Sequence, residues 1–231
     1  MKASTVSRVV AGMLAGVLTL AGCQSFSDSR LLHSDDFANL DRWVIEAEHA
    51  DARVTVHDGA LDIDTPAGIT LWFEPRLEGP LEIEFEATAV AEGGPNDEVS
   101  DLNVFWMASN RDGSAPFGRT GRFEDYNDLV TYYVGLGGNR NTTTRFRRYI
   151  GDAERRPLLP EHDLTSPDVL LVPETKQKIT LMADRNRIEY KRDGRALFQF
   201  DDPQPYTQGW FALRTTKSHL RIERLRIRRL D

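Results

Sequence analysis

The chain has 231 residues, of which 40% are hydrophobic and 28% are charged, and its formal net charge at pH 7 is −7. These values are typical of a single globular domain of about 200 residues that can bury a core. The acidic balance argues against a nucleic-acid partner, because binding to phosphates needs an excess of Lys and Arg. The chain contains 1 Cys, which excludes an intrachain disulfide.

Residues 1–22 have the features of a lipoprotein signal peptide. Two basic residues precede the apolar run VVAGMLAGVLTLAG, which is too short and too rich in small residues for a comfortable membrane span. The run ends in LAGC, which resembles a bacterial lipobox and predicts that Cys23 is lipidated and anchors the chain to a membrane. An ordinary signal peptide followed by a chance Cys is the alternative.

The residues after the lipobox indicate where the protein resides. Gln24 rather than Asp follows Cys23, which in Gram-negative bacteria indicates an outer-membrane lipoprotein. We therefore expect the protein in the bacterial cell envelope, facing the periplasm or the cell surface. Residues 23–33 are expected to form the lipidated Cys and a tether, and residues 34–231 a folded domain.

Beyond the tether, short apolar-polar alternations separated by Gly, Pro, Asp or Asn predict a succession of β-strands. Asp58-Gly59 and Asp193-Gly194 each interrupt such an alternation, and this dipeptide is a strong signal for a two-residue hairpin turn. The remaining strands, in chain order, are predicted in GITLWF, LEIEFEATAV, LNVFWMA, LVTYYVGL, KITLMA, GWFALRT and HLRIERLRIRRL, with a bulge near Glu223 in the last.

About a dozen short strands in one domain predict an all-β fold, a two-sheet antiparallel jelly-roll sandwich. No window has a convincing helical period. Two irregular stretches, 109–127 and 151–176, exceed the usual loop length, and loops of this length are usually functional or mobile.

The order of the segments carries a resemblance to a known superfamily. DDFANLDRW, VHDGALDI, GITLWF, GPLEIEFEATA, NVFWMA, YKRDGRALFQF and GWFALRT resemble, in this order, the concanavalin-A-like lectin/glucanase jelly rolls over residues 34–231. SDLNVFWMAS, GLGGNRNTTTRFRRY and FALRTTKSH resemble an uncharacterised bacterial family of secreted jelly rolls associated with polysaccharide degradation. The chain is also similar to a small intracellular jelly roll of rhamnogalacturonan utilisation. The resemblance implies a polysaccharide or oligosaccharide partner, but this fold hosts lectins, hydrolases, lyases and binding modules.

The hydrolase interpretation is tested by the acidic residues. Laminarinase-like members place acids at alternate positions of one strand, so that the carboxylates share a face and flank the scissile bond. Glu82, Glu84 and Glu86 have this spacing in LEIEFE, but their strand precedes NVFWMA, whereas the acidic strand of the family follows it. We interpret the three glutamates as the solvated face of a half-buried strand.

Polar groups in two adjacent predicted strands are the first candidates for a binding face. Alternation places Asp101 and Asn103 on one face of their strand, and it points Tyr132 and Tyr133 to opposite faces, so only one of the tyrosines can line a groove. The glycines of VGLGG are not followed by a helix and therefore do not form a dinucleotide cradle. Glycine in a strand more often marks a bulge or the close approach of a ligand, as in the stretch around Gly135.

The run NRNTTTRFRRY supplies further candidates. Arg145, Arg147 and Tyr149 share one face, where two guanidiniums match a carboxylate and the ring can stack on a sugar. Asn139 and Asn141 are predicted to bind substrate in the same run. The alternative is that these arginines pair with the chain's own Asp and Glu residues.

Other single residues are weaker candidates. His219 is a candidate acid/base group, Arg214 is expected at the edge of the groove, and the 5 His residues show no spacing for a metal site. We expect no cofactor; a structural calcium ion held by Asp35 and Asp36 remains open.

Two classes of function remain, and the enzyme is slightly favoured. In the first, Arg145, Arg147 or Asn103 neutralises a uronate while Tyr133 or His219 moves the proton of a β-elimination; a hydrolase would instead need a carboxylate pair including Asp101, with Asp128 or Glu124 as its partner. In the second, the protein is a non-catalytic glycan-binding lipoprotein.

Overall fold

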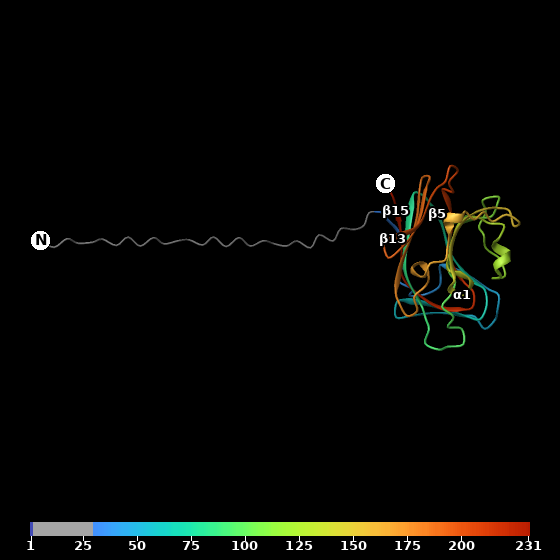
Figure 1. The fold of residues 1–231 in the computed structure, drawn as a ribbon, viewed down its shortest axis with the longest axis horizontal. Helices are drawn as coiled ribbons and strands as arrows, with labels where there is room; N and C mark the ends of the chain where they lie inside the picture. The colour runs from blue at the N-terminus through green and yellow to red at the C-terminus, as the bar shows by residue number, and fades with distance from the viewer. Residues whose placement is uncertain (2–29) are drawn as a thin grey trace.

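The computed structural model describes Met1 and residues 30–231. Residues 2–29 are drawn as a thin grey trace in Figure 1, so the predicted signal peptide boundary and Cys23 lie outside the described residues. Among the residues that are described, no helix has the length and apolar character needed to cross a lipid bilayer. The first strand, β1, begins at Leu31, inside the segment expected to be tether.

Two antiparallel sheets form the molecule and lie face to face as two layers (Figure 1). The strands of the eight-stranded sheet are, in spatial order, β13 (Arg195–Asp201), β12 (Arg187–Arg192), β11 (Gln177–Asp184), β6 (Leu81–Ala89), β15 (Ser218–Arg229), β4 (Ala60–Thr65) and β3 (Arg53–His57), with β1 (Leu31–Asp35) pairing with β15. Those of the seven-stranded sheet are β10 (Asp163–Leu164), β9 (Thr143–Ile150), β8 (Val130–Gly137), β7 (Leu102–Ser109), β14 (Gln208–Thr215), β5 (Ile69–Glu78) and β2 (Trp43–Ala47). The predicted all-β, two-sheet sandwich is confirmed.

The few helical turns in the described chain are short and lie in connections. They are the 3-10 turns η1 (Phe123–Tyr126), η2 (Pro160–His162) and η3 (Pro167–Val169), and the four-residue turn α1 (Gly138–Asn141). The two long irregular stretches predicted from the sequence fall between β7 and β8 and between β9 and β11.

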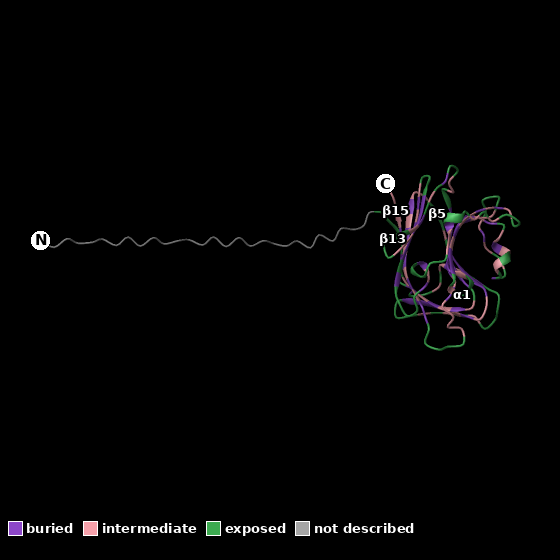
Figure 2. Ribbon diagram, in the orientation of Figure 1, coloured by how far each residue is buried: buried purple, intermediate pink, exposed green. Residues whose placement is uncertain are grey.

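Period-two alternation fills the space between the sheets. In β6, Leu81, Ile83 and Phe85 are fully buried while the residues between them are half-buried, and Figure 2 shows buried residues running along both sheets. Each such side chain contributes about 1.5–3 kcal/mol when it leaves water. The alternation therefore fixes which residues face the core and which face outward.

The glutamates of β6 lie on the outer face of the eight-stranded sheet, as interpreted from the sequence. Glu84 pairs with Lys178 at 2.6 Å, and Glu86 pairs with Arg224 at 3.1 Å. These pairs lie at the solvent-facing surface of the sheet, and none of the three glutamates lines the cationic pocket described below.

The two Asp-Gly hairpins and the bulge of β15 form where the sequence predicts them. Asp58-Gly59 joins β3 to β4 and Asp193-Gly194 joins β12 to β13, and all four residues have the positive φ that this turn requires. The register of β15 shifts between Glu223 and Arg226.

Candidate functional site

The outer face of the seven-stranded sheet carries a second apolar layer. It contains Trp72, Phe105, Tyr133, Tyr149 and Trp210, and the rings of Trp72 and Phe105 stack with their centroids 5.8 Å apart. Residues 110–129, called the lid here, lie over part of this layer. They add apolar side chains of their own to it, among them the buried Tyr126 and Leu129. An apolar layer on the outside of a sheet is stable only when something covers it, and the lid is that cover.

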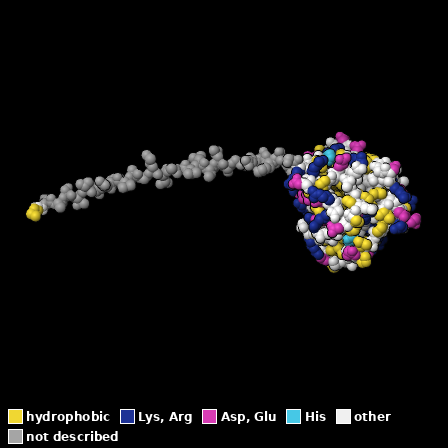
Figure 3. All heavy atoms as spheres, turned by 90° about the horizontal axis from the view of Figure 1, so that it is seen from above, with side chains coloured by type: hydrophobic (Ala, Val, Ile, Leu, Met, Phe, Trp, Pro, Cys, Tyr) yellow, Lys and Arg dark blue, Asp and Glu magenta, His cyan; other side chains and the backbone are white. Residues whose placement is uncertain are grey.

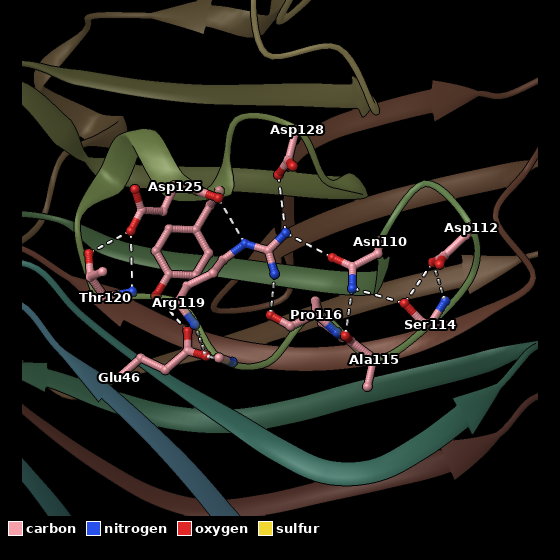
Figure 4. Close-up of polar contacts among 12 residues, drawn as sticks. Glu46, Asn110, Asp112, Ser114, Ala115, Pro116, Arg119, Thr120, Asp125 and Asp128 are labelled. Carbon is pink, nitrogen blue, oxygen red and sulfur yellow. Dashed lines mark hydrogen bonds and ion pairs between the residues drawn. The ribbon is translucent and has the colours of Figure 1, made fainter.

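Glu46 on β2 holds the lid in place (Figure 4). One carboxylate oxygen accepts hydrogen bonds from the backbone N–H groups of Gly118 at 2.6 Å and Arg119 at 2.9 Å. The other accepts from Trp72 Nε1 at 3.0 Å and from the Tyr126 hydroxyl at 2.7 Å. Glu46 is only 5% exposed. The four hydrogen-bond donors therefore replace the water that its carboxylate loses on burial.

The guanidinium of Arg119 links separate parts of the lid to one another. It donates to the Pro116 carbonyl at 2.6 Å, the Asp125 carbonyl at 2.8 Å, Asn110 Oδ1 at 2.8 Å and Asp128 Oδ1 at 3.1 Å (Figure 4). Asp128, considered as a hydrolase partner for Asp101, is therefore an exposed residue of the lid bound to Arg119. Neither Asp128 nor Glu124 lines a cavity with Asp101.

Beside the lid, the same face opens into a pocket of about 550 Å³, called the cationic pocket here. Its basic side chains come from four places in the chain: Arg140 from α1, Arg145 and Arg147 from β9, Arg156 from the following loop and Lys217 from the turn after β14. Such a volume is typical of small-ligand sites.

Two of these basic groups are compensated by carboxylates. Arg145 donates to both oxygens of Asp163, at 2.7 and 3.3 Å, and Lys217 pairs with Glu98 at 3.1 Å. The alternative of internal salt bridging thus holds for Arg145, although its side chain still lines the pocket. The face seen in Figure 3 also shows basic and acidic side chains interspersed.

Arg140, Arg147 and Arg156 differ, since none of them has a carboxylate within ion-pair distance in the described part of the chain. Arg147 instead donates to the carbonyl of Arg156 at 2.5 Å. Burial lowers the pKa of Arg147, and the nearby charges of Arg156 and Arg145 lower it further. A bound anion would relieve this mutual repulsion.

The floor of the pocket is built by neighbouring positions on β7, β8 and β9. Asn103 lies opposite Gly135, and Gly135 lies opposite Arg145. Because Gly135 has no side chain, the Tyr133 hydroxyl lies over it; a Cβ there would be 2.5 Å from that oxygen. Burial raises the pKa of Tyr133 well above its usual value, so the phenol is held as a neutral donor.

Two polar atoms at this floor have no protein partner among the described residues. Asn103 is 1% exposed and its buried Oδ1 accepts no hydrogen bond, and none of the hydrogen bonds within the described residues involves the Tyr133 hydroxyl. The Asn103 amide donates to Asp101 Oδ1 at 3.3 Å, and Ser100 Oγ donates to Asp101 Oδ2 at 2.6 Å. A free acceptor beside a free hydroxyl suits a ligand rich in hydroxyl groups.

The turn α1 presents Asn139 and Arg140 at the rim of the pocket. Asn139, Arg140 and Asn141 all have left-handed φ values of 54–58°, a conformation that costs roughly 1–2 kcal/mol per residue. Asn141 stabilises the turn because its amide donates to the Leu171 carbonyl and its Oδ1 accepts from the Leu171 N–H, both at 2.9 Å. Asn139 lines the pocket as predicted in position, whereas Asn141 is a structural clamp turned away from it.

Three other predicted ligand-binding residues lie beneath the surface. Tyr132 faces the core between the sheets and donates to Asp202 Oδ2 at 2.7 Å, so it cannot reach the pocket. Tyr149 is 0% exposed in the second apolar layer, where no sugar ring can stack on it. Arg214 is also buried, and it donates to Thr70 Oγ1 at 2.7 Å and to the Gly121 carbonyl of the lid at 2.9 Å.

His219 lies on the eight-stranded sheet, outside the residues that line the pocket. Its Nε2 contacts Asp62, and its Nδ1 lies 3.1 Å from Asp97 Oδ1. Burial alone would lower the pKa of His219, but the hydrogen bonds and charges of these carboxylates outweigh it and raise the pKa. The expected acid/base role at the groove has no geometric support, because both ring nitrogens are held by these acids.

Asp35 and Asp36 were considered as ligands for a structural calcium ion. Asp35 accepts hydrogen bonds from the Phe37 N–H at 2.8 Å and from Trp43 Nε1 at 2.9 Å, and Asp36 is exposed. No group of three or more His, Cys, Asp or Glu side chains in the described chain is arranged to hold a metal ion.

Sequence reasoning missed several residues that complete the pocket. Arg140 belongs to NRNTTTRFRRY, the run that supplied other candidates, and Phe123 and Arg156 lie in the two long irregular stretches, whose length is typical of functional or mobile loops. Glu98 and Lys217 had no signal of their own, because only the packing of distant loops brings them to the sheet.

The fold and the pocket together define a jelly-roll sandwich whose outer sheet face is half covered by a lid and half open as a cationic pocket. The chain belongs to the family described as "Domain of unknown function (DUF6250)", whose model matches residues 63–225. A comparison with curated protein sequences finds no significant match.

Solved structures share the predicted jelly-roll fold. A protein of unknown function with a galectin-like fold from Bacillus subtilis matches with a TM-score of 0.68 and 13% identity over 87% of this chain and 97% of that one. The carbohydrate-binding module CBM66 from Bacillus subtilis matches with a TM-score of 0.55 and 8% identity over 81% and 95%. LamAcat from Zobellia galactanivorans matches with a TM-score of 0.58 and 12% identity over 87% and 98%.

Proposed function

We propose that the cationic pocket binds an acidic, uronate-containing glycan. The observation that carries this proposal is the trio of guanidiniums without carboxylate partners, Arg140, Arg147 and Arg156, placed around two unpartnered polar atoms of Asn103 and Tyr133. Guanidiniums recognise a carboxylate, while the amide oxygen and the phenol recognise sugar hydroxyl groups. The carbohydrate-binding module CBM66, which shares the fold, supports a carbohydrate ligand by analogy alone.

Hydrolysis fits the pocket poorly. The strand after β7 turns Thr131, Tyr133 and Gly135 toward the outer face, so it carries no acidic ladder there. Of the two carboxylates in the pocket, Glu98 is paired with Lys217, and Asp101 accepts hydrogen bonds from its neighbours. With Glu98 bound to Lys217, Asp101 is the one carboxylate left among the lining residues, and hydrolysis needs a pair.

A β-elimination is the second candidate, favoured by the free hydroxyl of Tyr133. Arg147 would bind the uronate carboxylate and stabilise the charge that develops when the proton on the adjacent carbon leaves, while Asn103 Oδ1 would accept a hydrogen bond from a sugar hydroxyl. Asp101 would take that proton, the glycosidic C–O bond would break as the double bond forms, and Tyr133 would donate its proton to the departing oxygen. The raised pKa of Tyr133 suits the donor role and not that of the base.

The first experiment is calorimetric titration of the full-length protein with oligogalacturonates and alginate oligosaccharides, with methyl-esterified oligogalacturonates as the matched uncharged ligand. We expect binding of the acids and much weaker binding of the ester. Equal affinity for the acid and the ester would contradict the proposal. Release of unsaturated uronide, followed by its ultraviolet absorbance, distinguishes the lyase from the binder.

Substitution of Arg147 tests the pocket itself. A hydrogen bond to a charged group contributes about 1.5–3 kcal/mol, so Arg147→Gln should weaken binding by roughly tenfold to a hundredfold. Arg195→Gln is the control, because Arg195 makes an exposed ion pair with Asp168 on a different sheet. The proposal is wrong if both variants bind the acid like the unaltered protein.

Anchoring of the domain at the cell envelope through Cys23 is part of the same proposal and rests on the lipobox-like sequence. Only residues 24–30 separate Cys23 from β1. Incorporation of labelled palmitate by the intact protein and not by Cys23→Ala is the expected result. Equal labelling of both would refute the anchor.

A further inference from the structure

On the outer face of the seven-stranded sheet, a row of residues paired across adjacent strands runs from one strand to the next, and the lid covers part of this row. The row runs from β2 to β9 through Glu46, Thr70, Arg214, Asn103 and Gly135, ending at Arg145. The lid lies on Glu46 and Arg214, through the hydrogen bonds from Gly118, Arg119 and Tyr126 to the first and from the second to Gly121. The pocket occupies the remaining half, over β7, β8 and β9.

Phe123 of the lid forms the wall where the two halves meet. The guanidinium of Arg214 lies 5.0 Å from the ring centroid of Phe123, and that of Arg156 lies 5.4 Å from it. Arg214 is buried and Arg156 lines the pocket, so the ring is held between one cation beneath the lid and one at the site. Together with the three hydrogen bonds from the lid to Glu46, this makes the wall a fixed part of the fold.

We infer that the cationic pocket takes the end of a uronate chain, with the terminal sugar against Phe123, and that it does not take an internal segment. This rests on the proposed function and adds the mode of recognition. A chain crossing the sheet from β9 would meet Phe123 beyond Asn103, and the next position of the row, Arg214, is already covered by the lid backbone. Arg214 is 1% exposed, so the row offers no further open position for a sugar there.

End recognition is tested with size-fractionated homogalacturonan and alginate chains and the full-length protein. One protein should bind per chain whatever the chain length. Blocking one end, by 4-O-methylation of the non-reducing end or by neutral amine labelling of the reducing end, should weaken binding by about tenfold or more, while blocking the other end should not. The inference is overturned if neither block matters and the number of proteins bound per chain increases with length.

The wall itself is tested with two lid variants. Phe123→Ala should accept the oligosaccharide whose blocked end the unaltered protein rejects, because the ring no longer closes the pocket. Phe117→Ala is the matched control: this lid aromatic is also partly buried and packs 6.0 Å from Trp72, but it does not line the pocket. Rejection of the blocked chain by both variants, each with a native circular dichroism spectrum, would place the end of the site elsewhere and overturn the inference.

The two proposals fail in different ways. Binding of internal segments refutes end recognition and leaves acidic-glycan binding intact. If neither polymer binds in any form, both proposals fall together.

Discussion

Replacement of Glu46 by Ala should loosen the lid and destabilise the whole domain. The carboxylate is the common acceptor for Trp72 Nε1, the Tyr126 hydroxyl and the N–H groups of Gly118 and Arg119. Trp72 and Tyr126 are fully buried, so their donors cannot turn to water when the acceptor is removed. A buried donor left without a partner costs about 1–3 kcal/mol.

Two such donors give a loss of about 2–6 kcal/mol in the free energy of unfolding. Removing a buried charge returns part of its desolvation cost, so we expect the lower part of that range, about 2–4 kcal/mol. With a urea dependence of about 2 kcal/mol per molar, the unfolding midpoint should fall by about 1–2 M. Tryptophan fluorescence reports the change directly, because Trp72 is one of the residues that loses its partner.

Glu74→Ala is the matched control, since Glu74 lies on the adjacent strand β5 with an exposed carboxylate. A change within about 0.5 kcal/mol is expected for such a surface position. Limited trypsin digestion adds a local measurement: cleavage after Arg119 and Arg122 should be faster in Glu46→Ala. If the Glu46→Ala midpoint lies within about 0.3 M of the unaltered protein and the lid is cut no faster, the carboxylate does not hold the lid.

Two further substitutions test the hydrogen bonds of His219 and the floor of the cationic pocket. Because the pKa of His219 is raised, its bonds to Asp62 and Asp97 stabilise the fold fully below about pH 6.5. This stabilisation is lost progressively as the pH passes the raised pKa. In urea unfolding, His219→Ala should therefore lose most stability near pH ~5.5 and little near pH ~9. A loss independent of pH would contradict the charged bridge. Gly135→Ala should cost about 1–3 kcal/mol and weaken glycan binding, because the new Cβ displaces the Tyr133 hydroxyl; unchanged calorimetric affinity would show that this hydroxyl is not at the ligand.

The strand pattern and its turns followed from local rules, because each depends on neighbouring residues. Asp58-Gly59 marked a hairpin from the conformation that Gly permits, and Glu223 marked a bulge from a break in alternation. The same period of two predicted that Asp101 shares a face with Asn103, and Arg145 with Arg147, and all four residues line the cationic pocket. The opposite facing of Tyr132 and Tyr133 was foreseen too, yet no sequence rule told which of them faced the core.

What the sequence did not predict depends on long loops. Tyr149 has the right parity for the binding face, but it is 0% exposed in the apolar layer beneath the surface. Arg156 enters the pocket from a loop that has no period to read. Asn141 looked like a polar ligand group in a polar run, and its clamp on Leu171 appears only when residues 30 positions apart meet.

The pocket is cationic although the chain as a whole is acidic, and this contrast bears on the ligand proposed for it. A chain with a net charge of −7 repels polyanions at long range, but at physiological salt this repulsion is screened beyond about 8 Å. Half-buried guanidiniums such as Arg147 are screened much less, so attraction begins only when a carboxylate reaches the pocket. For the proposed uronate ligand, the acidic surface would disfavour non-specific adhesion along the polymer, and the walled pocket would favour the single point where a chain end fits, so that selectivity would arise from the contrast between the two.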